Sequence, residues 1–330
     1  MNIGLTYDLQ TDPTDERQAE FDPPATIAAL ERALQTLGHR VRRLGGAGEL
    51  LADPTRLQQV ELVFNIAEGG HGRCREAWVP MLLEQWGIPF VGSGPSAQAL
   101  GLDKVMSKRL AQASGVATPA FCVVDHPAKC AQAAALGFPL IVKPRHEGSG
   151  MGIDPGAVVQ EMAALERRVE WALARLRQPC LVERFIPFGE VTVLLIGNEA
   201  PQALPAIQRP LDPVSRLSCH VAGASPGAGW LCPVELTAEL DAEAARMALA
   251  MFRALRCRDL ARVDLRVDER QHLYFLEINP LPSFDPAGSL GLLAEYLGVS
   301  YAQLIGQILA AALRRLELPM GSADLSSVSP

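Results

Sequence analysis

Two short segments in the last third of the chain bring together acids and an amide that could bind a metal ion. They read ARVDLRVD (residues 261–268) and LEINPLP (residues 276–282). If they form an antiparallel hairpin, Asp264 lies opposite Glu277 and Arg262 lies opposite Asn279. Two facing carboxylates repel, so a cation is expected between them. Two carboxylates and an amide oxygen suit Mg²⁺, with Mn²⁺ as an alternative, when phosphate oxygens complete the coordination.

Period-two alternation predicts which side chains share a face with these acids. Phe275 is expected beside Arg262, Asp264, Glu277 and Asn279, and the other face is expected to be apolar, with Val263, Leu265, Val267, Tyr274, Leu276 and Ile278. The prolines after Asn279 end the strand and place the amide at an accessible rim. Alternatively, no ion binds, and Arg262 and Arg266 neutralise the acids on an ordinary sheet surface.

A glycine-rich loop follows a strand-like apolar run earlier in the chain. KPRHEGSGMGI begins at Lys143 and contains Gly148, Ser149, Gly150 and Gly152. Such a loop can close its backbone N–H groups over phosphate, and the lysine adds a positive charge. The pattern matches neither GxxxxGK[ST] nor GxGxxG, so neither a P-loop nor a dinucleotide-binding fold is predicted. By itself the loop is compatible with a mobile turn, but the distant carboxylate pair favours a phosphate site.

A third segment, VERFIPFGEVTV (residues 182–193), could contact a nucleotide. Glu183 and Glu190 lie at the two ends of a short connector that contains Pro187 and Gly189. Both carboxylates could accept hydrogen bonds from a base and a ribose. A plain β-strand in a core is the alternative interpretation.

Taken together, the motifs resemble the ATP-grasp carboxylate–amine ligases, and among them the D-alanine–D-alanine ligase group. The resemblance extends over residues 3–290 and rests on five segments in the family's order: DKVMSKRLAQASGVATP, IVKPRHEGSGMGI, VERFIPFGEVTV, ARVDLRVD and LEINPLP. It implies an α/β fold with an N-terminal Rossmann-like parallel sheet and two α+β ATP-grasp lobes that enclose ATP.

The resemblance also implies roles for individual residues. Lys104 and Lys143 would contact nucleotide phosphates under a lid formed by Gly148 to Gly152. Adenine would lie against Glu183, Phe185 and Ile186, and Glu190 would bind the ribose hydroxyls. Arg216 takes the place of a lysine near the γ-phosphate. The residues assigned to catalysis are Ser149 in the lid, Arg262 as an oxyanion stabiliser, and Ser283, which contributes through a nearby backbone N–H.

The positions expected to bind the amino acids depart from the family pattern. Gly150 replaces a second lid serine, Leu217 replaces a tyrosine, and Glu68 stands where histidine is expected in FNIAEGGHGRCREA. Glu68 and the nearby Glu76 could also be solvated loop acids. Glu16, Glu20 and Asp22 lie where the family binds the first substrate's ammonium group, and Ser289 and Leu290 lie where it binds the second substrate's carboxylate. The ATP chemistry is therefore expected to be kept, with altered amino-acid pockets.

We therefore expect an ATP-dependent acid–amino-acid ligase that acts on amino acids or small peptides. It would form a peptide or amide bond through an acyl phosphate and release ADP and phosphate. A true D-alanine–D-alanine ligase of cell-wall precursor synthesis is an alternative, as is a catalytically inactive or kinase-like nucleotide-binding protein. The presence of Arg262, Asp264, Glu277 and Asn279 together argues against inactivity.

Composition limits the partners and the location. The 330 residues are 48% hydrophobic and 20% charged, as in ordinary globular enzymes, and the net charge of -7 gives no basic footprint for nucleic acid. No apolar run approaches a membrane span, so no membrane partner is expected. Seven cysteines without a C-x-x-C pair suggest reduced thiols and a cytoplasmic protein. The family resemblance adds the expectation of a homodimer formed through the first domain.

Hydrophobic periodicity predicts the elements that position these residues. Strands alternate with helices in the first part, which predicts a parallel sheet. The expected strands are 3–7, 40–44, 62–65, 90–92, 120–124, 139–143, 179–185, 190–196, 260–267 and 273–278. The expected helices are 24–37, 80–86, 103–114, 161–177 and 238–255, followed by helices up to residue 316. The expected domains are 1–102, 103–187 and 188–320, with a flexible tail at 321–330.

Overall fold

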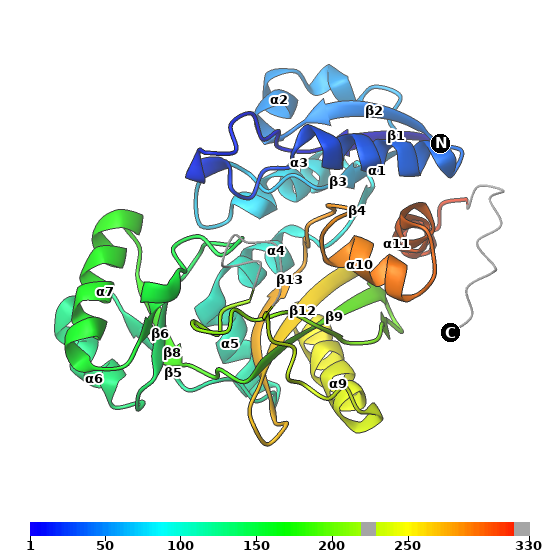
Figure 1. Ribbon diagram of the computed structural model, residues 1–330. Helices are drawn as coiled ribbons and strands as arrows, with labels where there is room; N and C mark the ends of the chain where they lie inside the picture. The colour runs from blue at the N-terminus through cyan, green and yellow to red at the C-terminus, as the bar shows by residue number, and fades with distance from the viewer. Residues whose placement is uncertain (219–228, 320–330) are drawn as a thin grey trace.

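The computed structural model describes residues 1–218 and 229–319 and contains three β-sheets (Figure 1). The first is parallel, as predicted, with the order β2-β1-β3-β4. Its strands are β1 (Asn2–Thr6), β2 (Arg40–Gly45), β3 (Leu62–Asn65) and β4 (Phe90–Val91). The accompanying helices are α1 (Pro24–Thr36), α2 (Ala47–Ala52) and α3 (Trp78–Trp86).

The second sheet is antiparallel, with the order β5-β8-β6-β7, and carries the glycine loop. Two helices, α4 (Pro95–Leu102) and α5 (Lys104–Ala113), lead into it. Its strands are β5 (Phe121–Val124), β6 (Leu140–Pro144), β7 (Val158–Val159) and β8 (Cys180–Arg184). Helices α6 (Cys130–Ala134) and α7 (Met162–Leu176) pack against the sheet through an apolar core.

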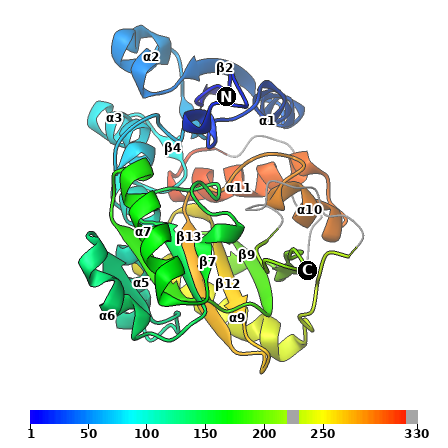
Figure 2. The same ribbon diagram turned by 60° about the vertical axis from the view of Figure 1, so that its left-hand side comes forward.

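The third sheet has the order β10-β9-β12-β13, and β11 also pairs with β9. Its strands are β9 (Gly189–Gly197), β10 (Gln202–Ala203), β11 (Ile207–Gln208), β12 (Asp259–Val267) and β13 (Leu273–Asn279). Helix α9 (Ala238–Leu255) packs on one face, as Figure 2 shows, and α5 packs on β13. On this covered face Val191, Val263 and Leu265 belong to one apolar core. The opposite face carries the polar residues of β9 and β12.

Helix α11 (Tyr301–Arg315) joins the first sheet to the third, and α10 (Ser289–Tyr296) precedes it. Leu304 and Ile308 share a buried core with Ile27 of α1. The buried carboxylate of Asp259 accepts a hydrogen bond from the N–H of Gly92 at 2.8 Å and pairs with Arg315 of α11 at 2.7 Å. The start of β12 is therefore anchored to the end of β4.

Each sheet lies within one of the predicted ranges 1–102, 103–187 and 188–320. Helix α11 packs on the first unit although it belongs to the third range, and the domain limits stay a prediction. The predicted flexible tail, 321–330, lies outside the described residues. Among the helices of the described ranges, no single one is long and apolar enough to cross a membrane. Helices α10 and α11 are long and apolar enough only when they are taken together, and a bend of 105° separates them.

The hairpin of β12 and β13 has the predicted pairing at the end that carries Asp264 and Glu277. Arg262 pairs with Asn279 and Asp264 with Glu277. A bulge then shifts the register, so that Leu265 pairs with Phe275.

The predicted faces are therefore wrong beyond the bulge, because an extra residue on one strand reverses the alternation that follows. Phe275 is buried in the apolar core and not beside the acids. Leu276 lines the open cavity on the other side, and Tyr274 pairs with Arg266 on that side as well.

Gly101 of α4 allows this helix to approach the end of β13 closely. A Cβ at this position would lie 2.6 Å from Cδ of Pro280 and 3.3 Å from the carbonyl oxygen of Ile278. We expect Gly101→Ala to lower the free energy of unfolding by about 1–3 kcal/mol, because the proline ring and the strand must move. Urea unfolding measures the change.

The matched control is Gly48→Ala in α2, where a Cβ meets nothing within 4 Å. That change should leave stability unaltered or raise it by about 0.5–1 kcal/mol, because alanine favours a helix. Wild-type stability of Gly101→Ala would contradict the proposed packing constraint.

Candidate active site

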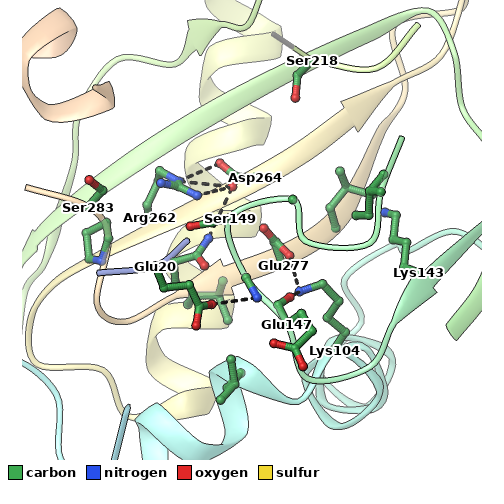
Figure 3. Close-up of a pocket in the computed structure, with 18 of the residues that line it drawn as sticks. Glu20, Lys104, Lys143, Glu147, Ser149, Ser218, Arg262, Asp264, Glu277 and Ser283 are labelled. Carbon is green, nitrogen blue, oxygen red and sulfur yellow. Dashed lines mark hydrogen bonds and ion pairs between the residues drawn. The ribbon is translucent and has the colours of Figure 1, made fainter. Parts of the chain in front are cut away.

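A cavity of about 310 Å³ lies where the three sheets meet. Lys104 and Glu277 meet in its middle, with Arg262 and Asp264 beside them (Figure 3). Most of the predicted site residues line this cavity: Glu20, Asp22, Glu68, Lys104, Lys143, Gly148, Ser149, Gly150, Glu183, Phe185, Ile186, Glu190, Leu217, Arg262, Asp264, Glu277, Asn279 and Ser283.

Asp264 and Glu277 each have a cationic partner. Arg262 pairs with Asp264 at 2.8 Å, and Lys104 pairs with Glu277 at 3.0 Å. Although burial opposes ionisation, Lys104 holds the pKa of Glu277 at about 2. Burial likewise opposes ionisation of Asp264, but Arg262 lowers the pKa of that carboxyl group. Both acids are therefore ionised at neutral pH.

The same side chains suit a divalent metal ion. Asp264, Glu277 and Asn279 line the cavity together, and the amide of Asn279 donates a hydrogen bond to Asp264 at 3.3 Å. Oxygen donors of this kind bind Mg²⁺ when phosphate supplies further ligands. Within residues 1–218 and 229–319, no three Asp, Glu, His or Cys side chains form a metal cluster by themselves. The donor set therefore fits a metal that arrives with an oxygen-rich ligand.

One side of the cavity is apolar and coincides with the predicted adenine slot. Phe185 packs with Ile141 and Leu217 in a small buried cluster, and Ile186 is 9% exposed. Leu217, predicted to contact substrate, therefore lies with the adenine residues and not with the acids predicted for the amino acid. The replacement of a tyrosine by leucine places an apolar side chain where its burial beside Phe185 is favourable.

The charged residues beside this slot are paired with each other. Glu183 is 1% exposed and forms ion pairs with Lys108 and Lys143. Burial opposes its ionisation, but these two lysines lower the pKa of Glu183 to about 2. Glu190 pairs with Arg266 at 3.2 Å, so Arg266 does not neutralise the metal-site acids. The nucleotide roles predicted for Lys143, Glu183 and Glu190 stay predictions.

The glycine loop lies over the middle of the cavity and is held by Lys104 of α5 and by Glu20 of the first unit (Figure 3). Lys104 Nζ donates to the carbonyl oxygen of Glu147 at 2.6 Å. The N–H of Gly148 donates to Glu20 Oε1 at 2.8 Å. Ser149 has a left-handed φ of 45°, a conformation that non-glycine residues rarely adopt and that is often found at functional sites.

Known proteins share this arrangement of sheets and motifs. A family model described as "D-ala D-ala ligase C-terminus" matches residues 110–310. The D-alanine–D-alanine ligase of Synechococcus sp. (strain JA-3-3Ab) is 33% identical over 323 residues, which cover 96% of this chain and 95% of that protein. The chain belongs to the D-alanine–D-alanine ligase family.

Two further matches, one in sequence and one in structure, are consistent with this family. The uncharacterized protein y4sG of Sinorhizobium fredii (strain NBRC 101917 / NGR234) is 35% identical over 306 residues, or 89% of each chain. The crystal structure of D-alanine–D-alanine ligase from Bacillus anthracis complexed with ATP matches with a TM-score of 0.74 at 22% identity, covering 96% of this chain and 98% of that one. The predicted ligase class and ATP-grasp fold are therefore confirmed.

The end of the cavity nearest the first sheet is acidic, in contrast to the family pattern of a histidine near Glu68. Glu76 and Asp22 are each only 8% exposed and line the cavity with Glu68. Burial and the neighbouring Glu20 raise the pKa of Glu76 to about 8, and burial and nearby acids raise the pKa of Asp22 to about 7. Burial and Glu76 also raise the pKa of Glu68 well above its ordinary value. The interpretation of Glu76 as a solvated loop acid is therefore wrong, whereas Glu68 is partly exposed and its role stays a prediction.

Two residues predicted for the second substrate's carboxylate do not line this cavity. Ser289 and Leu290 lie behind Arg262, where they line a small cavity of about 10 Å³. Ser289 accepts a hydrogen bond from Arg209 Nη2 at 2.6 Å. Arg209 lines the main cavity, so it connects the two cavities. The predicted contact of Ser289 and Leu290 with substrate stays a prediction.

Two predicted phosphate contacts also lie outside the cavity. Arg216 belongs to a turn in which its carbonyl oxygen accepts a hydrogen bond from Arg266 Nη1 at 3.0 Å. Gly152 lies at the far end of the glycine loop, and its carbonyl oxygen accepts a hydrogen bond from Arg168 at 2.7 Å. Glu16 is exposed and pairs with Arg175, away from the other N-terminal acids.

Sequence reasoning missed two residues that line the cavity, Glu147 and Arg209, and also Arg75, which pairs with two residues that line it. Arg75 is buried and pairs with Glu20 at 2.6 Å and with Glu147 at 3.3 Å. Glu147 directly precedes Gly148, so its place in the glycine motif was an available signal. Arg75 and Arg209 carry no such signal, because only long-range packing brings them to the cavity.

We expect Glu76→Gln to stabilise the free protein, and more strongly at about pH 8 than at about pH 5. The folded-state pKa of Glu76 lies above its ordinary value of 4.5, so its favourable contribution is present below about 4.5 and is lost as pH rises through about 8. Glutamine cannot ionise. The free energy of unfolding should therefore rise by about 1–3 kcal/mol at the higher pH.

Urea unfolding at the two pH values measures this effect. Glu84→Gln, whose side chain is 47% exposed on α3, is the control and should change stability by less than about 0.5 kcal/mol at either pH. A Glu76→Gln protein with the same stability as wild type at the higher pH would show that the carboxyl group is well solvated.

Proposed function

We propose that this protein is an ATP-dependent ligase that joins the carboxylate of an amino acid or small peptide to an amine, with release of ADP and phosphate. The observation that carries the proposal is the ionised pair Asp264 and Glu277 in one cavity with Lys104 and the glycine loop. A family relative of known structure, from Bacillus anthracis, is described as complexed with ATP. The same nucleotide is proposed here.

The cavity offers a consistent place for each part of ATP. Adenine would lie in the apolar slot against Phe185, Ile186 and Leu217, which exclude water from its faces. The polyphosphate would extend under the glycine loop, past Lys143 and Lys104. Backbone N–H groups and lysines stabilise phosphate charge, and this is the main requirement of phosphoryl transfer.

Asp264, Glu277 and Asn279 would hold Mg²⁺ together with phosphate oxygens. When bound, the metal supplies positive charge that offsets the negative charge of the phosphates. Lys104 would remain beside Glu277 and add a second positive group at the same place.

The reaction begins when a carboxylate oxygen of the first substrate attacks the γ-phosphorus. The bond to the β-γ bridging oxygen breaks, ADP leaves, and an acyl phosphate forms. The neutral amine of the second substrate then attacks the acyl carbon, phosphate leaves, and the amine nitrogen loses a proton as the amide forms. The glycine loop would exclude water, because an acyl phosphate hydrolyses readily.

Arg262 would stabilise the negative oxygen of the tetrahedral intermediate. Its Nε and Nη2 bind Asp264, and among the described residues no hydrogen bond engages Nη1. The guanidinium is therefore held in position with one free nitrogen at the cavity. Ser283 lines the same side of the cavity and could add a backbone N–H. Homodimer formation stays a prediction from the family resemblance, and a cytoplasmic location stays a prediction from the composition.

We expect Glu277→Gln to lower kcat by about 100-fold or more, because it removes one of two anionic metal ligands. The measurement is ADP and phosphate release at several Mg²⁺ concentrations, with mass spectrometry of the product. The matched control is Glu269→Gln, an exposed acid in the turn of the same hairpin, which should retain wild-type rates.

Each possible result separates the alternatives. Unchanged kinetics of Glu277→Gln at low Mg²⁺ would contradict the metal site. A phosphorylated substrate without amide would indicate a kinase-like enzyme. A dipeptide formed from D-alanine alone would identify a true D-alanine–D-alanine ligase.

A further inference from the structure

The acidic end of the cavity contains three carboxyl groups without a protein partner. We define this acidic end as Asp22, Glu68 and Glu76, all of which line the cavity. Among the described residues, none of their side chains forms a hydrogen bond or an ion pair, although Asp22 and Glu76 are each 92% buried, at 8% exposure. Buried carboxyl groups are normally paired, because an unpaired one loses hydration without compensation.

The cations nearest to these acids are already engaged. Arg75 pairs with Glu20 and Glu147, and its Nη1 donates to the carbonyl oxygen of His146 at 2.8 Å. Lys104 pairs with Glu277 and donates to the glycine loop. The described part of the chain therefore supplies no hydrogen-bonded or ion-paired cation to the carboxyl groups of the acidic end, and their ionised form calls for one from outside.

A metal ion is a poor match for these carboxyl groups. Within the described residues, no three acidic, histidine or cysteine side chains lie close enough to share one metal ion. An organic cation with several N–H donors spans a wider set of acceptors than a metal does. An ammonium or guanidinium group on a flexible chain therefore fits better.

Glu20 does not account for the acidic end. The family resemblance assigns the first substrate's ammonium group to the region of Glu16, Glu20 and Asp22. Glu20 is already bound by Arg75 at one oxygen and by the N–H of Gly148 at the other. Asp22 belongs to that region and borders the acidic end, whereas Glu68 and Glu76 lie outside it and remain available in addition.

We propose that the acidic end binds a second cationic group of the substrate, so that the enzyme acts on an amino acid with a basic side chain. This inference rests on the proposed ligase function and names its substrate class. The basic side chain would place its ammonium or guanidinium group between Glu68, Glu76 and Asp22. The reacting carboxylate would lie toward Arg262 and the glycine loop.

The first experiment compares substrates of matched shape. ADP release is measured with both enantiomers of lysine, ornithine and 2,4-diaminobutyrate, and with norleucine as the neutral counterpart of lysine. At least one diamino acid should give a kcat/KM about 30-fold or more above that of norleucine, because a charged hydrogen bond is worth that much in discrimination. Equal or higher kcat/KM for norleucine and alanine would overturn the inference while leaving the ligase function intact.

The second experiment tests the residues. Glu76→Gln and Glu68→Gln should each raise KM for the preferred diamino acid about 10-fold or more and leave the values for norleucine within about 3-fold. The control is again Glu84→Gln, which should leave both substrates unaffected. An equal loss for diamino and neutral substrates would indicate a structural role and contradict a cation site.

A binding measurement separates this inference from the ligase function. Calorimetry with 1,5-diaminopentane and the wild-type protein, without ATP, should show saturable binding that Glu76→Gln weakens about 10-fold or more. Such binding without ADP release on any substrate would refute the ligase and support the cation site. The cation site would be overturned if neither the diamine nor any of the diamino acids binds. It would also be overturned if Mn²⁺, added as MnCl₂ without a diamine, binds in a way that depends on Glu76.

Discussion

The strongest constraint on this structure is the approach of two carboxylates, Asp264 and Glu277, on neighbouring strands. Like charges this close in a buried cavity are unfavourable unless cations lie beside them. Different elements supply those cations, Arg262 from β12 itself and Lys104 from α5. Lys104 also holds the glycine loop through the carbonyl oxygen of Glu147. The charge balance of one hairpin therefore connects the third sheet, the helix before the central sheet, and the loop that covers the cavity.

The cavity changes in character along its length, and each part suits a different chemical group. Apolar side chains around Phe185 form one side, compensated ion pairs form the middle, and acids without counter-ions form the end beside the first sheet. In the middle, cations keep the pKa of Glu277 at about 2, whereas at the acidic end burial raises the pKa of Glu76 to about 8. Unbalanced buried acids lower stability, and such groups are concentrated at binding sites.

The first unit contributes the acidic end of the cavity. Glu68 and Glu76 both follow β3, and Glu76 lies in the short 3-10 helix Arg75–Ala77 before α3, so both lie beyond the carboxyl end of a parallel strand, where open α/β sheets commonly bind ligands. The two antiparallel sheets carry the metal-site acids and the glycine loop. In the proposed enzyme, nucleotide chemistry and choice of substrate would thus reside on different units, and the anchor between Asp259 and Gly92 holds these units together.

The sequence by itself determined the elements and the centre of the site. Apolar periodicity placed the main strands and helices close to their observed limits, and the expected hairpin turn paired Asp264 with Glu277, because both signals are local. The short helices α2, α4 and α6 lacked a clear period and were missed. Tertiary structure alone decided the bulge that buries Phe275, the burial of Glu76, and the packing of Leu217 beside Phe185. These depend on which distant segments approach one another, and no spacing within a segment contains that information.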